Sequence, residues 1–206
     1  MDNVDLALVL ALDCSASVTF DEFNLMAGAM GAALRDAEVI SGLTGGPARA
    51  SLGALLLWSG AGAQEVLVEW TRIDSEDTAK AFADAVENVP RAVRAGETAI
   101  GEALLAALTL LAHLPTSAHR QVVDVIGDGR SNAGIPPGPV RDRMAAIGIT
   151  INGLCVLHEE ADLLESYERH VIGGPGAFAL PCPDYPAFAE AMRRKLVREI
   201  TDKPIA

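Results

Sequence analysis

An almost unbroken apolar run, DLALVLAL at residues 5–12, stands close to the start of the chain. It has the length of a β-strand, and its apolar residues do not alternate with polar ones, so both faces of the strand are expected to be buried. Strands of this kind occur in parallel sheets that carry helices on both faces. The run therefore predicts an α/β fold with this strand near the middle of the sheet.

The rest of the chain alternates between apolar runs of strand length and helical segments. The runs at 50–58 and 65–71 are joined by the glycine-rich SGAGAQ and predict a hairpin. Later strands are expected at 120–126, 149–157 and 176–181. Helices are expected at 19–37, opened by a capping box from Thr19 to Glu22, and at 74–87, 98–114, 136–148, 160–171 and 185–200.

These elements predict one domain over residues 1–206 with a three-layer, Rossmann-like α/β architecture. The sheet is expected to be mostly parallel, with six strands in the order 3-2-1-4-5-6 and right-handed crossovers. The tight hairpin adds one antiparallel edge strand. No internal repeat or linker interrupts the pattern.

The charge balance restricts the class of partner. Lys plus Arg number 16 against 28 Asp plus Glu, which gives a formal net charge of −12. This excess of acid argues against a nucleic-acid partner and against anionic membranes, and it favours a cation as ligand. No apolar run reaches the roughly 18 to 20 residues of a membrane span. The basic residues of the last helix, Arg193, Arg194, Lys195 and Arg198, are expected on its solvated face.

Oxygen-bearing side chains follow the first and fourth predicted strands. Asp13, Ser15 and Ser17 occupy every second position after the first strand, so an extended backbone would point all three to one side. Asp128 follows the fourth strand, and Thr98 lies at the start of the buried helix. Ligands of such sheets bind beyond the carboxyl ends of the strands, where the strand order reverses. The five side chains are therefore expected at that point.

Two carboxylates and three hydroxyls make a hard set of ligands composed only of oxygen. No histidine or cysteine stands at matching spacing, so zinc and copper are poor candidates. Mg²⁺ suits such ligands, and so do Mn²⁺ and Ca²⁺. The sequence predicts a site for one of these cations.

The motif Asp13-Cys14-Ser15-Ala16-Ser17 resembles the DxSxS motif of the von Willebrand factor type A domain family, which includes the integrin inserted domains. The metal-ion-dependent adhesion site of that family also uses a threonine from a second loop and an aspartate after the fourth strand. Thr98 in GETAIGEAL and Asp128 in GDGRSN match these positions. More narrowly, LALVLALDCSAS, GETAIGEAL, GITINGL and VIGGPGAF resemble an uncharacterised bacterial branch of that family, domain of unknown function 1194.

The resemblance implies a six-coordinate Mg²⁺ bound by some of Ser15, Ser17 and Thr98, with Asp13 and Asp128 acting directly or through water. One coordination position would stay open for a Glu or Asp of a protein partner. It thus implies a non-enzymatic adhesion or assembly module. Two alternatives stay open: an Mg²⁺-dependent hydrolase or phosphoryl-transfer enzyme that uses the same site, and a regulatory subunit of a larger machine.

The cysteines and the cellular location are linked. Cys155 and Cys182 lie near the ends of two predicted neighbouring strands, so a disulfide between them and a pair of buried thiols are both compatible with the sequence. Members of the resembled branch are often exported. The expected location is therefore periplasmic or extracellular, with a leader absent from this chain, although a cytoplasmic location stays open.

Overall fold

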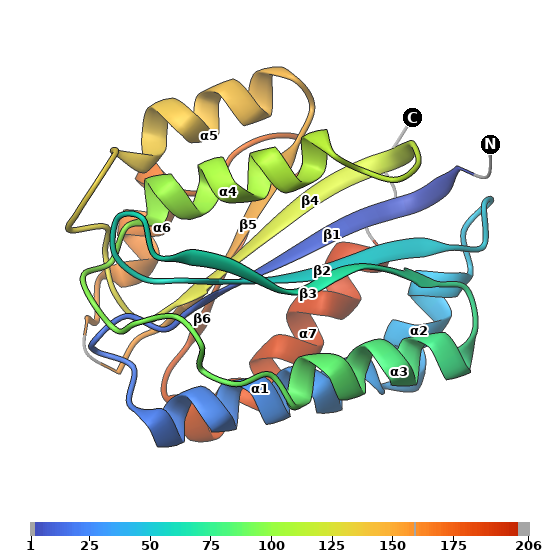
Figure 1. Ribbon diagram of the computed structural model, residues 1–206, viewed down its shortest axis with the longest axis horizontal. Helices are drawn as coiled ribbons and strands as arrows, with labels where there is room; N and C mark the ends of the chain where they lie inside the picture. The colour runs from blue at the N-terminus through green and yellow to red at the C-terminus, as the bar shows by residue number, and fades with distance from the viewer. Residues whose placement is uncertain (1–2, 159, 202–206) are drawn as a thin grey trace.

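The computed structural model describes residues 3–158 and 160–201, and these form a six-stranded sheet between two layers of helices (Figure 1). The strand order is β3-β2-β1-β4-β5-β6, as predicted. The strands are β1 (Val4–Asp13), β2 (Ser51–Trp58), β3 (Gln64–Ile73), β4 (Ala118–Gly127), β5 (Thr150–Val156) and β6 (Ala179–Cys182). Only β3 pairs antiparallel to its neighbour, so the expected antiparallel edge strand is confirmed.

Helices cover both faces of the sheet. One layer contains α1 (Phe20–Leu34), α2 (Ala37–Thr44), α3 (Glu76–Glu87) and α7 (Phe188–Thr201), and a short 3₁₀ turn η1 (Tyr185–Ala187) leads into α7. The other layer contains α4 (Ile100–Ala112), α5 (Pro137–Ala146) and α6 (Leu163–His170). None of the described helices is both long and apolar enough to span a bilayer.

The first strand is buried on both faces, which explains its unbroken apolar run. Alternate residues of β1 belong to two separate hydrophobic clusters, one on each face of the sheet. The leucines Leu6, Leu8, Leu10 and Leu12 face the layer of α1 and α7, whereas Ala7, Val9 and Ala11 face the layer of α4. Because β1 pairs with β2 on one side and with β4 on the other, it is a rigid central support for the loop that follows it.

The first helical segment differs from the expectation. The capping box is present, because Thr19 Oγ1 accepts from Glu22 N and the Glu22 carboxylate accepts from Thr19 N. However, α1 ends at Leu34 rather than at Ala37, and a second helix, α2, begins directly afterwards. The side chain of Asp36 caps α2 by accepting from the backbone N of Glu38 at 2.9 Å. An aspartate inside an apolar helical pattern is a start signal that the periodicity concealed.

The structure excludes the disulfide. Cys14, Cys155 and Cys182 are all free and buried. In the pairing of β5 with β6, Cys182 lies opposite Val156, whereas Cys155 lies opposite Pro181. The two cysteines are therefore offset by one residue, which places their side chains on opposite faces of the sheet, in different hydrophobic clusters. The alternative of two buried thiols is confirmed. The cysteines therefore give no support to an oxidising compartment.

The last helix also differs from the expectation. Arg194 and Arg198 are exposed as expected, but the Lys195 side chain is completely buried. Its ammonium group forms ion pairs with Asp124 of β4 and, at 3.2 Å, with Glu199 one turn further along α7. Asn152 Nδ2 on β5 donates to Glu199 Oε1 at 2.7 Å. Polar contacts within an apolar layer thus hold α7 against strands β4 and β5 of the sheet.

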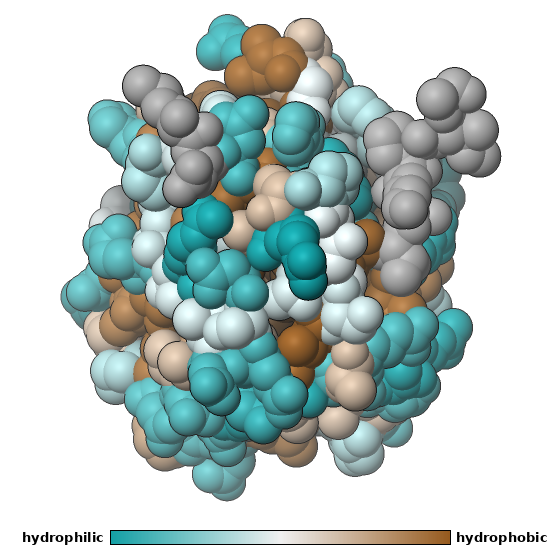
Figure 2. Space-filling model, turned by 90° about the vertical axis from the view of Figure 1, so that its right-hand side faces the viewer, coloured by the Kyte–Doolittle hydropathy of each residue, from teal (hydrophilic) through white to brown (hydrophobic). Residues whose placement is uncertain are grey.

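The two ends of the described chain lie far from the carboxyl ends of the parallel strands. β1 starts and α7 finishes on the same side of the molecule (Figure 1). Figure 2 shows this side, where hydrophilic side chains cover most of the surface and apolar side chains lie in small separate groups. The oxygen-bearing loops lie at the opposite end.

Candidate metal-binding site

The loop after β1 holds the first three predicted site residues. The Asp13 side chain is buried where β1 ends, and its Oδ1 accepts a hydrogen bond from Ser15 N at 2.7 Å. This Asx-type contact turns the chain away from the strand. The loop then brings Ser15 Oγ and Ser17 Oγ within 3.2 Å of each other. The two hydroxyls therefore lie close together, although a turn at residues 15–18, and not the extended backbone that was expected, brings them there.

A hydrogen bond joins the first loop to the loop after β4. Ser17 Oγ donates to Asp128 Oδ1 at 2.7 Å, although the two residues are 111 positions apart in the sequence. The second oxygen of Asp128, Oδ2, accepts from the Tyr185 hydroxyl at 3.0 Å. Both oxygens of this carboxylate are thus held in place by elements on either side of it.

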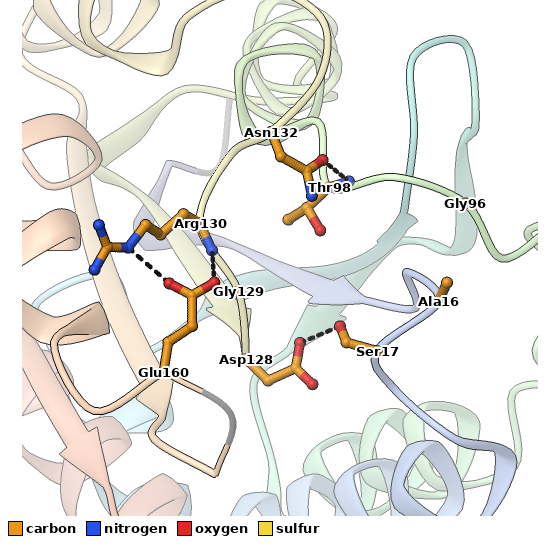
Figure 3. A pocket seen from close by; sticks show the side chains of 9 residues that line it. All are labelled: Ala16, Ser17, Gly96, Thr98, Asp128, Gly129, Arg130, Asn132 and Glu160. Atoms are coloured by element: carbon orange, nitrogen blue, oxygen red, sulfur yellow. Dashed lines mark hydrogen bonds and ion pairs between the residues drawn. The ribbon is translucent and has the colours of Figure 1, made fainter.

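Thr98 approaches from a third segment, just before α4. Its backbone N donates to Asn132 Oδ1 at 2.8 Å, and its carbonyl oxygen accepts from Asn132 N at 2.9 Å. Asn132 belongs to the loop after β4, so Thr98 and Asp128 are positioned by the same loop (Figure 3). Gly101 in the first turn of α4 allows this close approach, because a β-carbon there would overlap the carbonyl oxygen of Ile135.

These segments enclose a cavity of about 340 Å³ at the carboxyl ends of β1 and β4 (Figure 3). Its lining residues are Ala16, Ser17, Gly96, Thr98, Asp128, Gly129, Arg130, Asn132 and Glu160. Three of the five predicted residues thus line the cavity. Asp13 and Ser15 are almost fully buried and do not line it, but Ser15 joins it through the hydroxyl contact with Ser17.

The two site carboxylates lie in a poorly solvated environment. Burial raises the pKa of Asp13 to about 7, and the nearby Asp128 adds to this effect, whereas the hydrogen bond from Ser15 N and the charge of Arg91 oppose it. Burial also raises the pKa of Asp128, against the hydrogen bonds from Ser17 and Tyr185. A cation between these carboxylates would favour their ionised forms.

One oxygen of the site lacks a partner. Asp13 Oδ2 is buried and accepts no hydrogen bond from the described residues, and the same residues offer no partner to the buried hydroxyl of Tyr167. A β-carbon on Gly127 would lie 2.9 Å from both of these oxygens, so only a glycine leaves them this room. A buried carboxylate oxygen without a donor is costly, and a cation or its bound water would satisfy it.

Sequence reasoning missed several residues that position the site. The guanidinium group of Arg91 donates to the carbonyl oxygens of Cys14 and Ser15, both at 3.0 Å, and so holds the first loop from outside. Tyr185 and Glu160 come from the far end of the chain and were also missed. No spacing rule identifies such residues, because each reaches the site only through the tertiary fold. Asn132 lies in the GDGRSN segment, but its contact with Thr98 depends on two loops meeting.

Comparison with known proteins identifies the family of this chain. The family model described as "Protein of unknown function (DUF1194)" matches residues 3–204. The chain belongs to this family. None of the curated proteins matches the sequence of this DUF1194 member.

Solved structures show that this DUF1194 chain has the fold of von Willebrand factor type A domains. It superposes on a von Willebrand factor type A protein from Catenulispora acidiphila with a TM-score of 0.64 at 18% identity, over 96% of this chain and 43% of that one. The vWF domain of the type V pili tip protein Mfa5 from Porphyromonas gingivalis gives 0.60 at 10% identity, over 98% of both chains.

A third solved structure has a metal in its title. Proximal thread matrix protein 1 from the mussel byssus, "with zinc occupied MIDAS motif", gives a TM-score of 0.67 at 16% identity, over 96% of this chain and 46% of that one. The DUF1194 chain spans about half the length of the first solved structures that it matches. At these identities the likeness establishes the fold.

Proposed function

We propose that this protein is a metal-ion-dependent protein-binding module of the adhesion or assembly type. Its cation, Mg²⁺ or alternatively Mn²⁺ or Ca²⁺, would be held by Asp13, Ser15, Ser17, Thr98 and Asp128. One observation carries the proposal: the hydrogen bond from Ser17 to Asp128 joins two loops that are distant in sequence beside the buried Thr98, at the switch point of the sheet.

The donor atoms fit a hard cation. The unpartnered Asp13 Oδ2 would accept the cation or one of its waters. Within the described residues, no three His, Cys, Asp or Glu side chains gather as a metal cluster, so hydroxyl oxygens would supply much of the coordination. Neutral hydroxyls suit Mg²⁺, Mn²⁺ or Ca²⁺ better than a soft metal. The zinc of the mussel protein belongs to that protein's title and does not decide the metal here.

The residues of the site would divide the work. Ser15, Ser17 and Thr98 would bind without adding charge, and the buried carboxylates of Asp13 and Asp128 would act on the cation directly or through water. A bound cation would offer a positive centre at the mouth of the cavity. Because the hydroxyls are neutral and a carboxylate that contacts the cation through water neutralises it only in part, a Glu or Asp of a protein partner is the chemistry that the cation would attract.

The non-enzymatic class, the partner and the location are parts of the same proposal. A byssus matrix protein and a pilus tip protein share the fold, which supports a role in adhesion or assembly and an exported location. We treat residues 1–206 as one domain, because the family model spans 3–204. No contact among the described residues specifically favours a hydrolase, a phosphoryl-transfer enzyme or a regulatory subunit.

Calorimetric titration of Mg²⁺, Mn²⁺ and Ca²⁺ into chelator-treated protein tests the proposal. We expect saturable binding at one site that is lost in Asp13→Ala and Thr98→Ala. Thr109→Ala, which removes an exposed hydroxyl further along α4, is the matched control and should bind like the unaltered chain. Equal binding by all variants would reject the site, and Mg²⁺-dependent turnover of generic phosphate or ester substrates would favour the enzymatic alternative.

A further inference from the structure

An acidic residue outside the five predicted positions lies at the wall of the metal cavity. Glu160 comes from the segment between β5 and α6 and lines the cavity with Thr98 and Asp128 (Figure 3). Its carboxylate is fixed, because Oε1 accepts from the backbone N of Arg130 at 3.2 Å and Oε2 accepts from Arg130 Nε at 2.6 Å. Arg130 also forms an ion pair with Asp162.

Gly129 lies between Glu160 and Thr98, and it has no side chain to fill the space between their oxygens. A β-carbon on Gly129 would lie 3.7 Å from Thr98 Oγ1 and 3.8 Å from Glu160 Oε1. These two oxygens can be no farther apart than the two distances added together. A hydroxyl and a carboxylate that share a cation through one bound water are separated by up to about 7 Å, given Mg–O bonds of about 2.1 Å and a hydrogen bond of about 2.7 Å. The two oxygens therefore lie within about 7.5 Å of each other, a range that includes the separation bridged by one bound water.

We propose that Glu160 is a sixth residue of the metal site, which accepts a hydrogen bond from a water carried by the cation, and that Arg130 positions it. The inference rests on the proposed function, since it assumes that a cation binds beside Thr98. A contact through water fits better than direct ligation, because Glu160, Asp13 and Asp128 do not form a close acidic cluster among the described residues. Mg²⁺ also keeps several of its waters when proteins bind it.

The competing explanation is that Glu160 only anchors its own segment. An exposed ion pair such as Glu160–Arg130 contributes little to stability, so this role alone would leave the metal site unaffected. Two substitutions separate the explanations. Glu160→Gln keeps the shape and removes the charge, whereas Glu160→Asp keeps the charge and withdraws it by one methylene. A role that depends on position requires both to weaken metal binding, but a diffuse effect of charge requires only the first to do so.

The test is Mg²⁺ titration by calorimetry of the unaltered chain, Glu160→Gln, Glu160→Asp and Glu165→Gln, with thermal unfolding to confirm that each variant folds. Glu165 is an exposed carboxylate that pairs with Arg169 on α6 and serves as the matched control. We expect affinity to fall about fivefold or more in both Glu160 variants, as for loss of a hydrogen bond to a charged group, and to stay unchanged in Glu165→Gln.

Proton relaxation of water with bound Mn²⁺ then counts the waters on the ion. We expect the same count in the unaltered chain and in Glu160→Gln, because Glu160 would contact water and not the metal. An extra water in Glu160→Gln would overturn the contact through water. Unchanged affinity in Glu160→Asp, with binding still lost in Asp13→Ala, would overturn this inference and leave the proposed function intact. If the unaltered chain bound none of the ions, both proposals would fail.

Discussion

The Tyr185 hydroxyl donates to Asp128 Oδ2 at 3.0 Å and thereby joins the loop after β4 to the 3₁₀ turn that leads into α7. The bond crosses 57 positions of sequence and is buried. Its partner atom on the same carboxylate, Oδ1, accepts from Ser17. The loop after β1 and the 3₁₀ turn η1 therefore hold the Asp128 carboxylate from two sides.

Tyr185→Phe removes this hydrogen bond and leaves the aromatic ring. We expect the free energy of unfolding without metal to fall by about 1–3 kcal/mol, because a buried carboxylate loses a donor. Urea unfolding in the presence of a chelator measures the change. Tyr167→Phe is the comparison, since the Tyr167 hydroxyl has no partner among the described residues, and it should cost less. Equal losses in both variants would contradict the role given to the Tyr185 bond.

The buried carboxyl of Asp13 predicts how stability without metal depends on pH. Burial raises its pKa to about 7 in the folded protein, from an ordinary value near 3.8. Between these values the folded state keeps a proton that the unfolded state has released. The stability that the protonated Asp13 carboxyl contributes is therefore complete below about pH 4 and is lost as the pH rises to about 7. The free energy of unfolding falls by up to about 4 kcal/mol over this interval.

The variant Asp13→Asn isolates this contribution. We expect the stability of the unaltered chain, relative to Asp13→Asn, to decrease between about pH 4 and pH 7 in chelator-containing buffer. Urea unfolding at several pH values gives the comparison. Profiles that run parallel over this range would show that Asp13 does not titrate there. Since protons and cations compete for the same carboxyl, Mg²⁺ affinity should rise over the same interval.

The buried ion cluster under the sheet gives a stability prediction. Lys195→Met leaves the carboxylates of Asp124 and Glu199 buried without a cation, and burial already raises the pKa of Asp124 well above its ordinary value. We expect a loss of about 3–5 kcal/mol in the free energy of unfolding. Arg194→Met on the exposed side of the same helix should change it by less than about 0.5 kcal/mol. A similar small effect of Lys195→Met would show that the cluster is not needed to hold α7.

The three thiols should be unreactive in the folded protein. Burial raises the pKa of Cys14 to about 12 and that of Cys182 to about 11, and it also raises the pKa of Cys155. A thiol reacts as its thiolate, so a water-soluble disulfide reagent at pH 8 should label none of them until denaturant is added, when three should react. Rapid labelling of one thiol under native conditions would indicate local opening near that residue.

The predictability of the fold follows from local signals. The apolar run of β1 and the Thr19–Glu22 capping box both act over a few residues, and the sequence therefore predicted them correctly. The Asp36 cap was missed because the apolar pattern continues across it. Lys195 was misplaced because its partner Asp124 lies on another element, although an aspartate within the apolar run of β4 was a signal of a buried charge.

The residues of the candidate site likewise fall into those that the sequence predicted and those that it missed. Asp13, Ser15 and Ser17 are neighbours in sequence, and Thr98 and Asp128 were placed by topology, so their convergence could be predicted. Arg91, Tyr185 and Glu160 could not, because each contacts the site from a distant segment whose path depends on the whole fold. Short motifs identify residues that share a local backbone shape, whereas supporting residues are selected by distance in space.

The two ends of the described chain lie on the side of the molecule opposite the cavity lined by Thr98 and Asp128 (Figure 1). A fusion partner, a biotin tag or a sensor surface linked next to Asn3 or Thr201 would therefore attach on the side away from the cavity. Immobilised in this way, the protein would present the cavity outward, so a partner screen on a chip or bead can use either attachment without obstructing the face under test.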